Sequence, residues 1–180
     1  MELFPPMPSW EAAHPLVVHF PIALILVAWV PMVVGLVDVR RRWAWMGAGL
    51  LLLVMGTAGA FIAVLSGEAT EDKVVVTSEL IERAIHEHEE AGEMARTLAV
   101  AATAMFVVAL GLGAGMKKGR GRTLAVGVAA VVFAGVYGLC AQRLAWAGHR
   151  GGELVHAYGV RAPMVAPPVS PDVRGRDEDD

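Results

Sequence analysis

Four long apolar segments, separated by polar connections, dominate the hydrophobic pattern of this 180-residue chain. We place them at about residues 16–37, 43–66, 97–116 and 123–146. A helix needs roughly 17–25 mostly apolar residues to cross the hydrocarbon core of a membrane. The pattern therefore predicts an all-α membrane protein, a bundle of four transmembrane helices that occupies residues 14–160.

The composition excludes several other classes of protein. Hydrophobic residues make up 56% of the chain and charged residues 18%, against roughly 45–50% and about 25% in ordinary soluble domains. No GxSxG, Walker or zincin motif is present, and a one-chain transporter usually has ionisable residues at mid-membrane, which this chain lacks. We expect an electron-transfer or structural protein in the lipid bilayer, with no nucleic acid partner, rather than a hydrolase or transferase.

Charges between the apolar segments predict the orientation. The short first connection holds three arginines at 40–42, and the third holds four bases between Lys117 and Arg122. The second connection holds nine acids and two bases from Glu68 to Glu93. Short basic loops stay in the cytoplasm. We therefore expect both termini and the acidic connection on the outer side, with residues 1–13 as an external segment.

Polar residues and prolines predict some further detail. Ser78 can cap an external helix, placed at about residues 79–96, that runs into the third span. Pro21 and Pro31 lie inside the first span and should bend its helix. Residues 161–180 are rich in proline and then in charge, which predicts a disordered external tail.

The six histidines are the most informative polar residues. With this topology they lie at the outer side of the membrane or just within it: His14, His19, His86, His88, His149 and His156. They come from the start of the first span, the segment before the third and the end of the fourth. These helix ends meet at one level in a four-helix bundle, so we predict that the functional site lies there.

Helical periodicity separates the inward from the solvated histidines. His19 lies about one turn inside the first span, where a polar ring usually has a partner or a function. His14 is about 140° around the same helix, so a regular helix does not bring both rings to one atom. His88 shares an apolar face with Ile85, whereas His86 lies on the opposite, acidic face.

The arrangement favours haem b and electron transfer. Two inward imidazoles from different helices can hold a b-type haem axially, and arginines, Arg83 and Arg96 among them, can bind its propionates. Glycines after the fourth span let a loop approach a ligand closely. The candidate cofactor-binding residues are His14, His19, His88, His149, Arg143, Arg150, Gly151 and Gly152, with His19, His88 and His149 as metal ligands.

Alternatives stay open at this point. Imidazoles and glutamates could instead hold zinc or copper. His86 and Glu90 are weaker ligand candidates, because Glu90 stands where the second histidine of an HExxH motif would be. The histidines could also merely hydrogen-bond helix ends, with no cofactor, in a structural or assembly subunit of a membrane redox complex. A homo-oligomer is compatible with each alternative.

Two sequence segments resemble a known family. HPLVVHFPIAL at 14–24 and GHRGGELVHAYGV at 148–160 are similar to the opening and closing segments of small bacterial four-span membrane proteins without an assigned function. HEEAG at 88–92 matches the histidine that such proteins carry before the third span. The resemblance carries over His14, Pro15, His19, Pro21, His88, His149, Gly151, Gly152 and Glu153, whereas His156 stands where such proteins usually have an aromatic residue.

The resemblance also implies a setting. Relatives are sometimes joined to cytochrome or Rieske-type iron–sulfur domains. It therefore implies a multi-pass protein of the bacterial inner membrane, with a cytochrome or an iron–sulfur protein as its redox partner.

Overall fold

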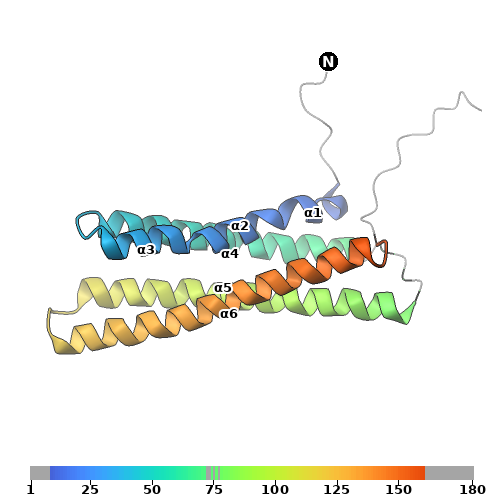
Figure 1. Cartoon of the computed structure of the whole chain (residues 1–180). Helices are drawn as coiled ribbons and strands as arrows, with labels where there is room; N and C mark the ends of the chain where they lie inside the picture. Colours follow the sequence, from blue (N-terminus) through green and yellow to red (C-terminus); the bar gives the residue numbers. More distant parts are fainter. Residues whose placement is uncertain (1–8, 72–73, 75, 77, 161–180) are drawn as a thin grey trace, which may run out of the picture.

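The computed structural model describes residues 9–71, 74, 76 and 78–160. Its elements are η1 (Trp10–Ala12), α1 (His14–Val17), α2 (His19–Val27), α3 (Trp29–Val37), α4 (Arg42–Glu71), α5 (Glu79–Gly115) and α6 (Arg120–His156), with no strand among these residues. Figure 1 shows two antiparallel pairs, α1–α3 with α4 (the first hairpin) and α5 with α6 (the second hairpin), whose connecting loops lie at the same end. The predicted all-α architecture with four passes is confirmed.

The first pass is interrupted twice, and prolines explain both interruptions. A single residue separates α1 from α2 and another separates α2 from α3, each three residues before Pro21 or Pro31. Proline has no N–H for the carbonyl four residues earlier, and its ring clashes with that carbonyl. Near the second interruption, the Tyr137 hydroxyl of α6 donates a hydrogen bond to the Ile25 carbonyl at 2.5 Å. The prolines thus disturb the helix where the sequence predicts bends.

The third pass is one continuous helix, α5, that begins well before the third apolar segment. Its first turn is capped by Ser78, whose hydroxyl accepts a hydrogen bond from the Ile81 amide at 3.4 Å. The helix then runs without interruption to Gly115. The predicted external helix and the third span are therefore a single element.

The fourth pass corrects the sequence-based expectation of a loop after residue 146. Helix α6 continues to His156, so the residues of that expected loop are helical: His149, Gly151 and Gly152. A glycine costs about 1 kcal/mol in a helix interior, and contacts with α5 offset this cost. One of them is the ion pair between Arg150 and Glu87, at 2.8 Å.

The surface of the bundle is as apolar as its core. Ile25, Leu53 and Cys140 are fully buried where the passes meet. Large apolar side chains from every pass are exposed, among them Leu36, Leu51, Val108 and Val131. All four passes are long and apolar enough to cross a membrane, and exposed apolar side chains suit contact with lipid.

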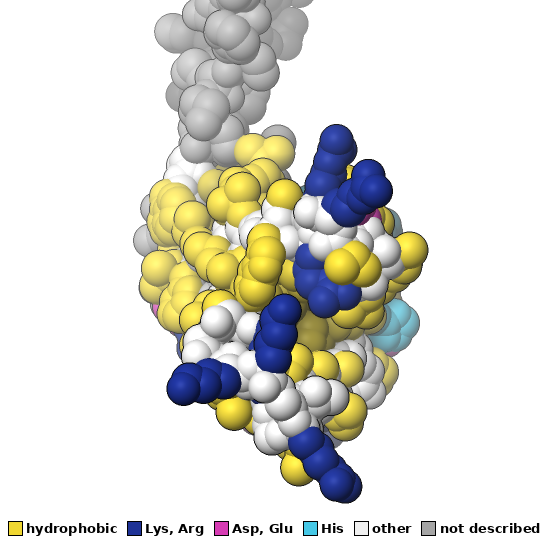
Figure 2. Space-filling model, turned by 90° about the vertical axis from the view of Figure 1, so that its left-hand side faces the viewer, with side chains coloured by type: hydrophobic (Ala, Val, Ile, Leu, Met, Phe, Trp, Pro, Cys, Tyr) yellow, Lys and Arg dark blue, Asp and Glu magenta, His cyan; other side chains and the backbone are white. Residues whose placement is uncertain are grey.

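The two ends of the bundle differ in charge. Figure 2 looks onto the end with the two connecting loops and shows basic side chains gathered there. They belong to Arg40, Arg41, Arg42, Lys117, Lys118, Arg120 and Arg122. The opposite end, the pocket end, carries the acidic first turns of α5 and all six histidines. Its position on the outer side of the membrane stays a prediction, and the tail at 161–180 lies outside the described residues.

Candidate functional site

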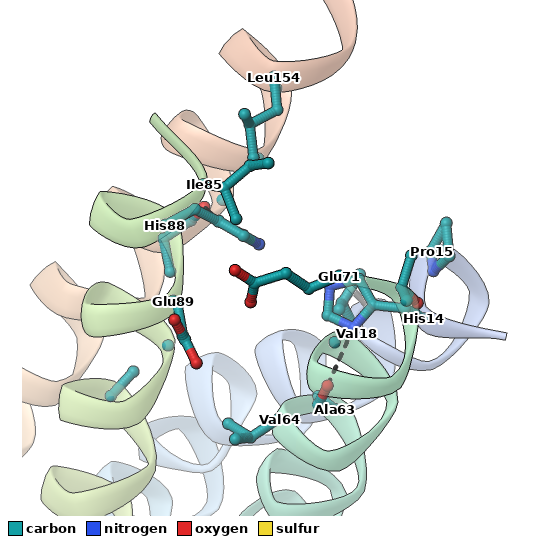
Figure 3. A pocket seen from close by; sticks show the side chains of 18 of the residues that line it. His14, Pro15, Val18, Ala63, Val64, Glu71, Ile85, His88, Glu89 and Leu154 are labelled. Atoms are coloured by element: carbon teal, nitrogen blue, oxygen red, sulfur yellow. Dashed lines mark hydrogen bonds between the residues drawn. The ribbon is translucent and has the colours of Figure 1, made fainter. Parts of the chain in front are cut away.

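A pocket of about 520 Å³ lies among the four passes at the pocket end of the bundle. This volume falls within the range of roughly 300–1,000 Å³ that is usual for small-molecule and cofactor sites. Most of its lining is apolar or small, and a few polar side chains enter it, which Figure 3 shows from close by. These few polar groups decide what the pocket can bind.

Helix α1 brings His14 into this pocket. The ring Nδ1 lies 2.9 Å from the Ala63 carbonyl oxygen and 3.2 Å from the Ser66 hydroxyl oxygen, both on α4. A carbonyl can only accept a hydrogen bond, so Nδ1 carries the proton and donates it. The Nε2 atom of His14 is then the unprotonated nitrogen, with a lone pair available to a ligand.

Helix α5 brings His88 into the same pocket through an equivalent contact. Its Nδ1 lies 3.0 Å from the Ala147 carbonyl oxygen of α6, so here too Nδ1 donates and Nε2 keeps its lone pair. The ring centroids of His14 and His88 are 6.1 Å apart, with their planes at 86°. Two half-buried imidazoles from different hairpins therefore meet in one pocket.

Two glycines give the rings their space. A Cβ atom at Gly67 of α4 would lie 3.1 Å from Cε1 of His14, and one at Gly151 of α6 would lie 3.0 Å from Cε1 of His88. Either contact is tighter than ordinary van der Waals packing, so a side chain at either position would displace a ring. At Gly152 a Cβ would meet nothing within 4 Å.

His19 lies at the pocket but is turned to its own helix. Its Nδ1 donates to the Pro15 carbonyl at 2.8 Å, and the side chain is exposed. The sequence argument favours His19 as the deeper ring, whereas the structure places His14 beside His88. Depth along a helix does not say which direction the side chain faces, and the interruption between α1 and α2 changes that direction.

The other three histidines do not join the pair. His149 is exposed and lies 5.9 Å from the Trp146 ring, away from the pocket lining. His86 is 68% exposed and lies 3.8 Å from Glu90, as the acidic face of the helix predicts. His156 is exposed at the rim of the pocket.

The predicted arginines are separated in the same way. Arg150 forms ion pairs with Glu87 and Glu153, both at 2.8 Å, and Arg143 does not line the pocket. Arg96 does line it, next to the ion pair that it makes with Glu93 at 3.1 Å. Among the described residues, Arg96 is therefore the arginine at the pocket.

One carboxylate also points into the pocket. Glu71, from the last turn of α4, extends into the space between the two rings in Figure 3. Among the described residues, no group of three or more His, Cys, Asp or Glu side chains is placed to hold a metal ion together. The pocket thus offers two imidazoles as a facing pair, with one carboxylate nearby.

Sequence reasoning missed the helix that holds His14. The signal was a short pattern, Ala-x-x-x-Gly, that occurs on α4 at 63–67 and again on α6 at 147–151. In both places the alanine carbonyl accepts from a ring and the glycine, one turn later, makes room for that ring. The pattern by itself is too common to identify a site.

Comparison with known proteins gives one match. The model of a family described as "Predicted membrane protein (DUF2231)" matches residues 11–163. This range includes both hairpins and every residue of the pocket lining. No curated protein and no solved structure matches the chain.

Proposed function

The chain belongs to this family of predicted membrane proteins, and we propose that it binds one haem b between His14 and His88 and transfers electrons with it. One observation carries the proposal: each ring donates its Nδ1–H to a backbone carbonyl and leaves Nε2 for a ligand. Histidines that ligate a metal almost always donate their other ring N–H in this way, which sets the tautomer and the ring orientation.

The separation of the rings supports a single metal centre between them. A metal–imidazole bond is about 2.0 Å long and the bonded nitrogen lies about 1.1 Å from the ring centre, so two imidazoles on opposite sides of one metal have centroids about 6 Å apart. The observed separation is 6.1 Å. The angle of 86° between the ring planes is compatible with this, because an axial imidazole can rotate about its bond to the metal.

The number of protein donors favours haem over a bare ion. The porphyrin supplies four nitrogen donors, so haem iron needs only two side chains from the protein. Structural zinc sites usually use four protein ligands and catalytic ones three, and no such group is formed by the described residues. Arg96 at the pocket offers a cation for a haem propionate.

Two imidazole ligands also favour electron transfer over other haem chemistry. Iron with six nitrogen donors has no open position at which a substrate could bind. Such a centre exchanges electrons and does little else. A cytochrome or an iron–sulfur protein that reaches the pocket end is the partner that this role needs.

The charge pattern supports the side of the membrane. The basic end that Figure 2 shows would face the cytoplasm of a bacterial cell, and the pocket end and both termini would lie outside. A reporter fused after Gly119, in the loop between α5 and α6, should behave as cytoplasmic. An external reading there would reverse the orientation.

An absorption spectrum tests the haem most directly. The full chain, expressed with ample haem and purified in detergent, should show a Soret band that shifts when dithionite is added. His14→Ala and His88→Ala should each remove or alter that band, and His86→Ala should not, because His86 is exposed outside the pocket. A wild-type protein without a Soret band would overturn the proposal.

Glu71 supports a second candidate. Its carboxylate points into the space beside both rings in Figure 3, so a modest movement would make two imidazoles and one carboxylate the ligands of zinc or copper. Stoichiometric zinc or copper by elemental analysis, without a Soret band, would select this candidate. Absence of both haem and metal would leave the rings as ties between helices, as expected for a structural or assembly subunit.

A further inference from the structure

The same histidine contact occurs once in each hairpin. In the first hairpin, His14 donates from Nδ1 to the Ala63 carbonyl at 2.9 Å. In the second, His88 donates from Nδ1 to the Ala147 carbonyl at 3.0 Å. In both cases the histidine is on the first helix of the hairpin and the carbonyl on the second, at the pocket end.

An arginine contact is repeated at the basic end. In the first hairpin, Nε of Arg42 donates to the Gly35 carbonyl at 3.2 Å. In the second, Nη2 of Arg122 donates to the Gly113 carbonyl. Here the arginine lies at the start of the second helix and the glycine near the end of the first, so the two hairpins share this contact too.

The two contacts also have the same register in each hairpin. In the first hairpin, 21 residues separate them on both sides (14 to 35 and 42 to 63), and in the second, 25 residues do so (88 to 113 and 122 to 147). Four additional residues are about one turn of α-helix. The second hairpin is therefore the first one with one extra turn in each arm, and both run in the same direction in Figure 1.

The rings lie in the same pose against their partner helices. A Cβ atom at Gly67 would lie 3.1, 3.3 and 3.9 Å from Cε1, Nδ1 and Nε2 of His14. One at Gly151 would lie 3.0, 3.4 and 3.7 Å from the same atoms of His88. Each glycine follows the accepting alanine by four residues, so carbonyl and glycine lie on one face of the helix.

We infer that the chain consists of two copies of one helical-hairpin unit, and that Gly67 and Gly151 are equivalent positioning residues that seat its two imidazoles. The pocket between the copies then takes a ligand that accepts two like nitrogen donors, one from each copy. For haem b these are the two axial positions of the iron. This last step rests on the proposed function, whereas the equivalence of the rings does not.

Matched glycine variants test the equivalence without any ligand. In the purified full chain labelled with ¹⁵N-histidine, His14 and His88 should both give the signals of the Nδ1–H tautomer with a hydrogen-bonded proton. Gly67→Ala should shift or remove that signal for His14, and Gly151→Ala should do the same for His88. Gly152→Ala is the control, because its methyl group enters open space and should leave both rings unchanged.

The absorption spectrum separates this inference from the proposed function. If the wild type binds haem, Gly67→Ala and Gly151→Ala should both shift its Soret band, and Gly152→Ala should keep the wild-type spectrum. If no haem binds but the histidine signals behave as expected, the haem proposal fails and the equivalence stands.

Two results would overturn the inference. One is a pair of wild-type rings with different tautomers, a measurement that needs no variant to fold. The other is a folded Gly67→Ala or Gly151→Ala protein whose ring signals match those of Gly152→Ala.

Discussion

The first and second hairpins hold their imidazoles alike, but the helices around the rings are packed differently. In the first hairpin, α4 is central, and its eight buried residues contact the interrupted pass α1–α3 and helix α5. In the second, α6 is peripheral and buries only three of its 37 residues. Equivalent ring contacts therefore lie in a densely packed setting in one hairpin and near the lipid-facing edge in the other. Local contacts, rather than shared surroundings, keep the two rings in the same pose.

The residues next to the rings differ as well. In the first hairpin, fully buried Ser66 donates to the Ala63 carbonyl at 2.9 Å and contacts the His14 ring. The corresponding position in the second hairpin is Arg150, three residues after Ala147, and it forms ion pairs instead. The first ring is thus supported by neutral hydrogen bonds away from water. The second has charged neighbours that salt can screen.

The pocket shows the same asymmetry. Glu71 lies eight residues after Ala63, and the corresponding residue after Ala147 is Val155. Both line the pocket, so a ligand between the two rings meets a carboxylate from one hairpin and an apolar side chain from the other. The difference teaches that the imidazoles are the shared part of the site and that Glu71 is particular to the first hairpin.

Removal of either ring should have the largest effect. His14→Ala and His88→Ala should each abolish the six-coordinate haem spectrum, because the iron then loses one of its two axial nitrogens. The two losses should be alike, while circular dichroism should still report a helical protein. His149→Ala, an exposed ring outside the pocket lining, is the control. Loss of the spectrum with only one ring would break the comparison.

Loss of an arginine contact at the basic end should come next. Arg42→Gln and Arg122→Gln each remove a charge-assisted hydrogen bond to a glycine carbonyl, so each should lower the free energy of unfolding by about 1.5 kcal/mol. Thermal unfolding in detergent would measure both values. Arg40→Gln, in the exposed loop, should change little. Clearly unequal values for the two hairpins would argue that the contacts are not equivalent.

Ser66→Ala should have a smaller effect that is confined to the first hairpin. The hydroxyl contacts the His14 ring and donates to the Ala63 carbonyl in a fully buried place, so its loss should cost about 1 kcal/mol. The ¹⁵N signal of His14 should shift, and that of His88 should stay. Thr97→Ala removes an exposed hydroxyl bond to its own helix and serves as the matched control.

The ion pair of the second hairpin should have the smallest effect. Glu87→Gln removes the partner of Arg150 on α5, and because both side chains are partly exposed the cost should be under about 1 kcal/mol. Unfolding of the wild type at low and high salt should differ by more than that of the variant. An equal salt dependence in both proteins would show that the charged neighbours of the second ring do not stabilise it.

Several parts of the structure could be predicted from the pattern of residues. The four apolar segments gave the four passes, and the prolines gave the irregular places in the first pass. The apolar and acidic faces of α5 correctly separated half-buried His88 from exposed His86. That separation worked because this part of α5 carries both polar and apolar residues, so its two faces differ.

The same reasoning could not choose between His14 and His19, because both lie in a segment that is apolar on every side. Nor could it find the extension of α6, where glycines suggest a loop and only contacts with α5 show that the helix continues. The repeat was also invisible, since the two copies share little beyond Ala-x-x-x-Gly and a histidine. These features depend on which helices meet.

The sequence by itself determined that this protein has four apolar passes, one basic end and one end rich in acids and histidines. Those properties follow from the free energy of transferring side chains into lipid and from charge, which act residue by residue. Only the tertiary structure decided that His14 meets His88, and that Gly67 and Gly151 seat the two rings. In a membrane the lipid-facing and the neighbour-facing sides of a helix are both apolar, so the hydrophobic pattern does not say which way a helix turns.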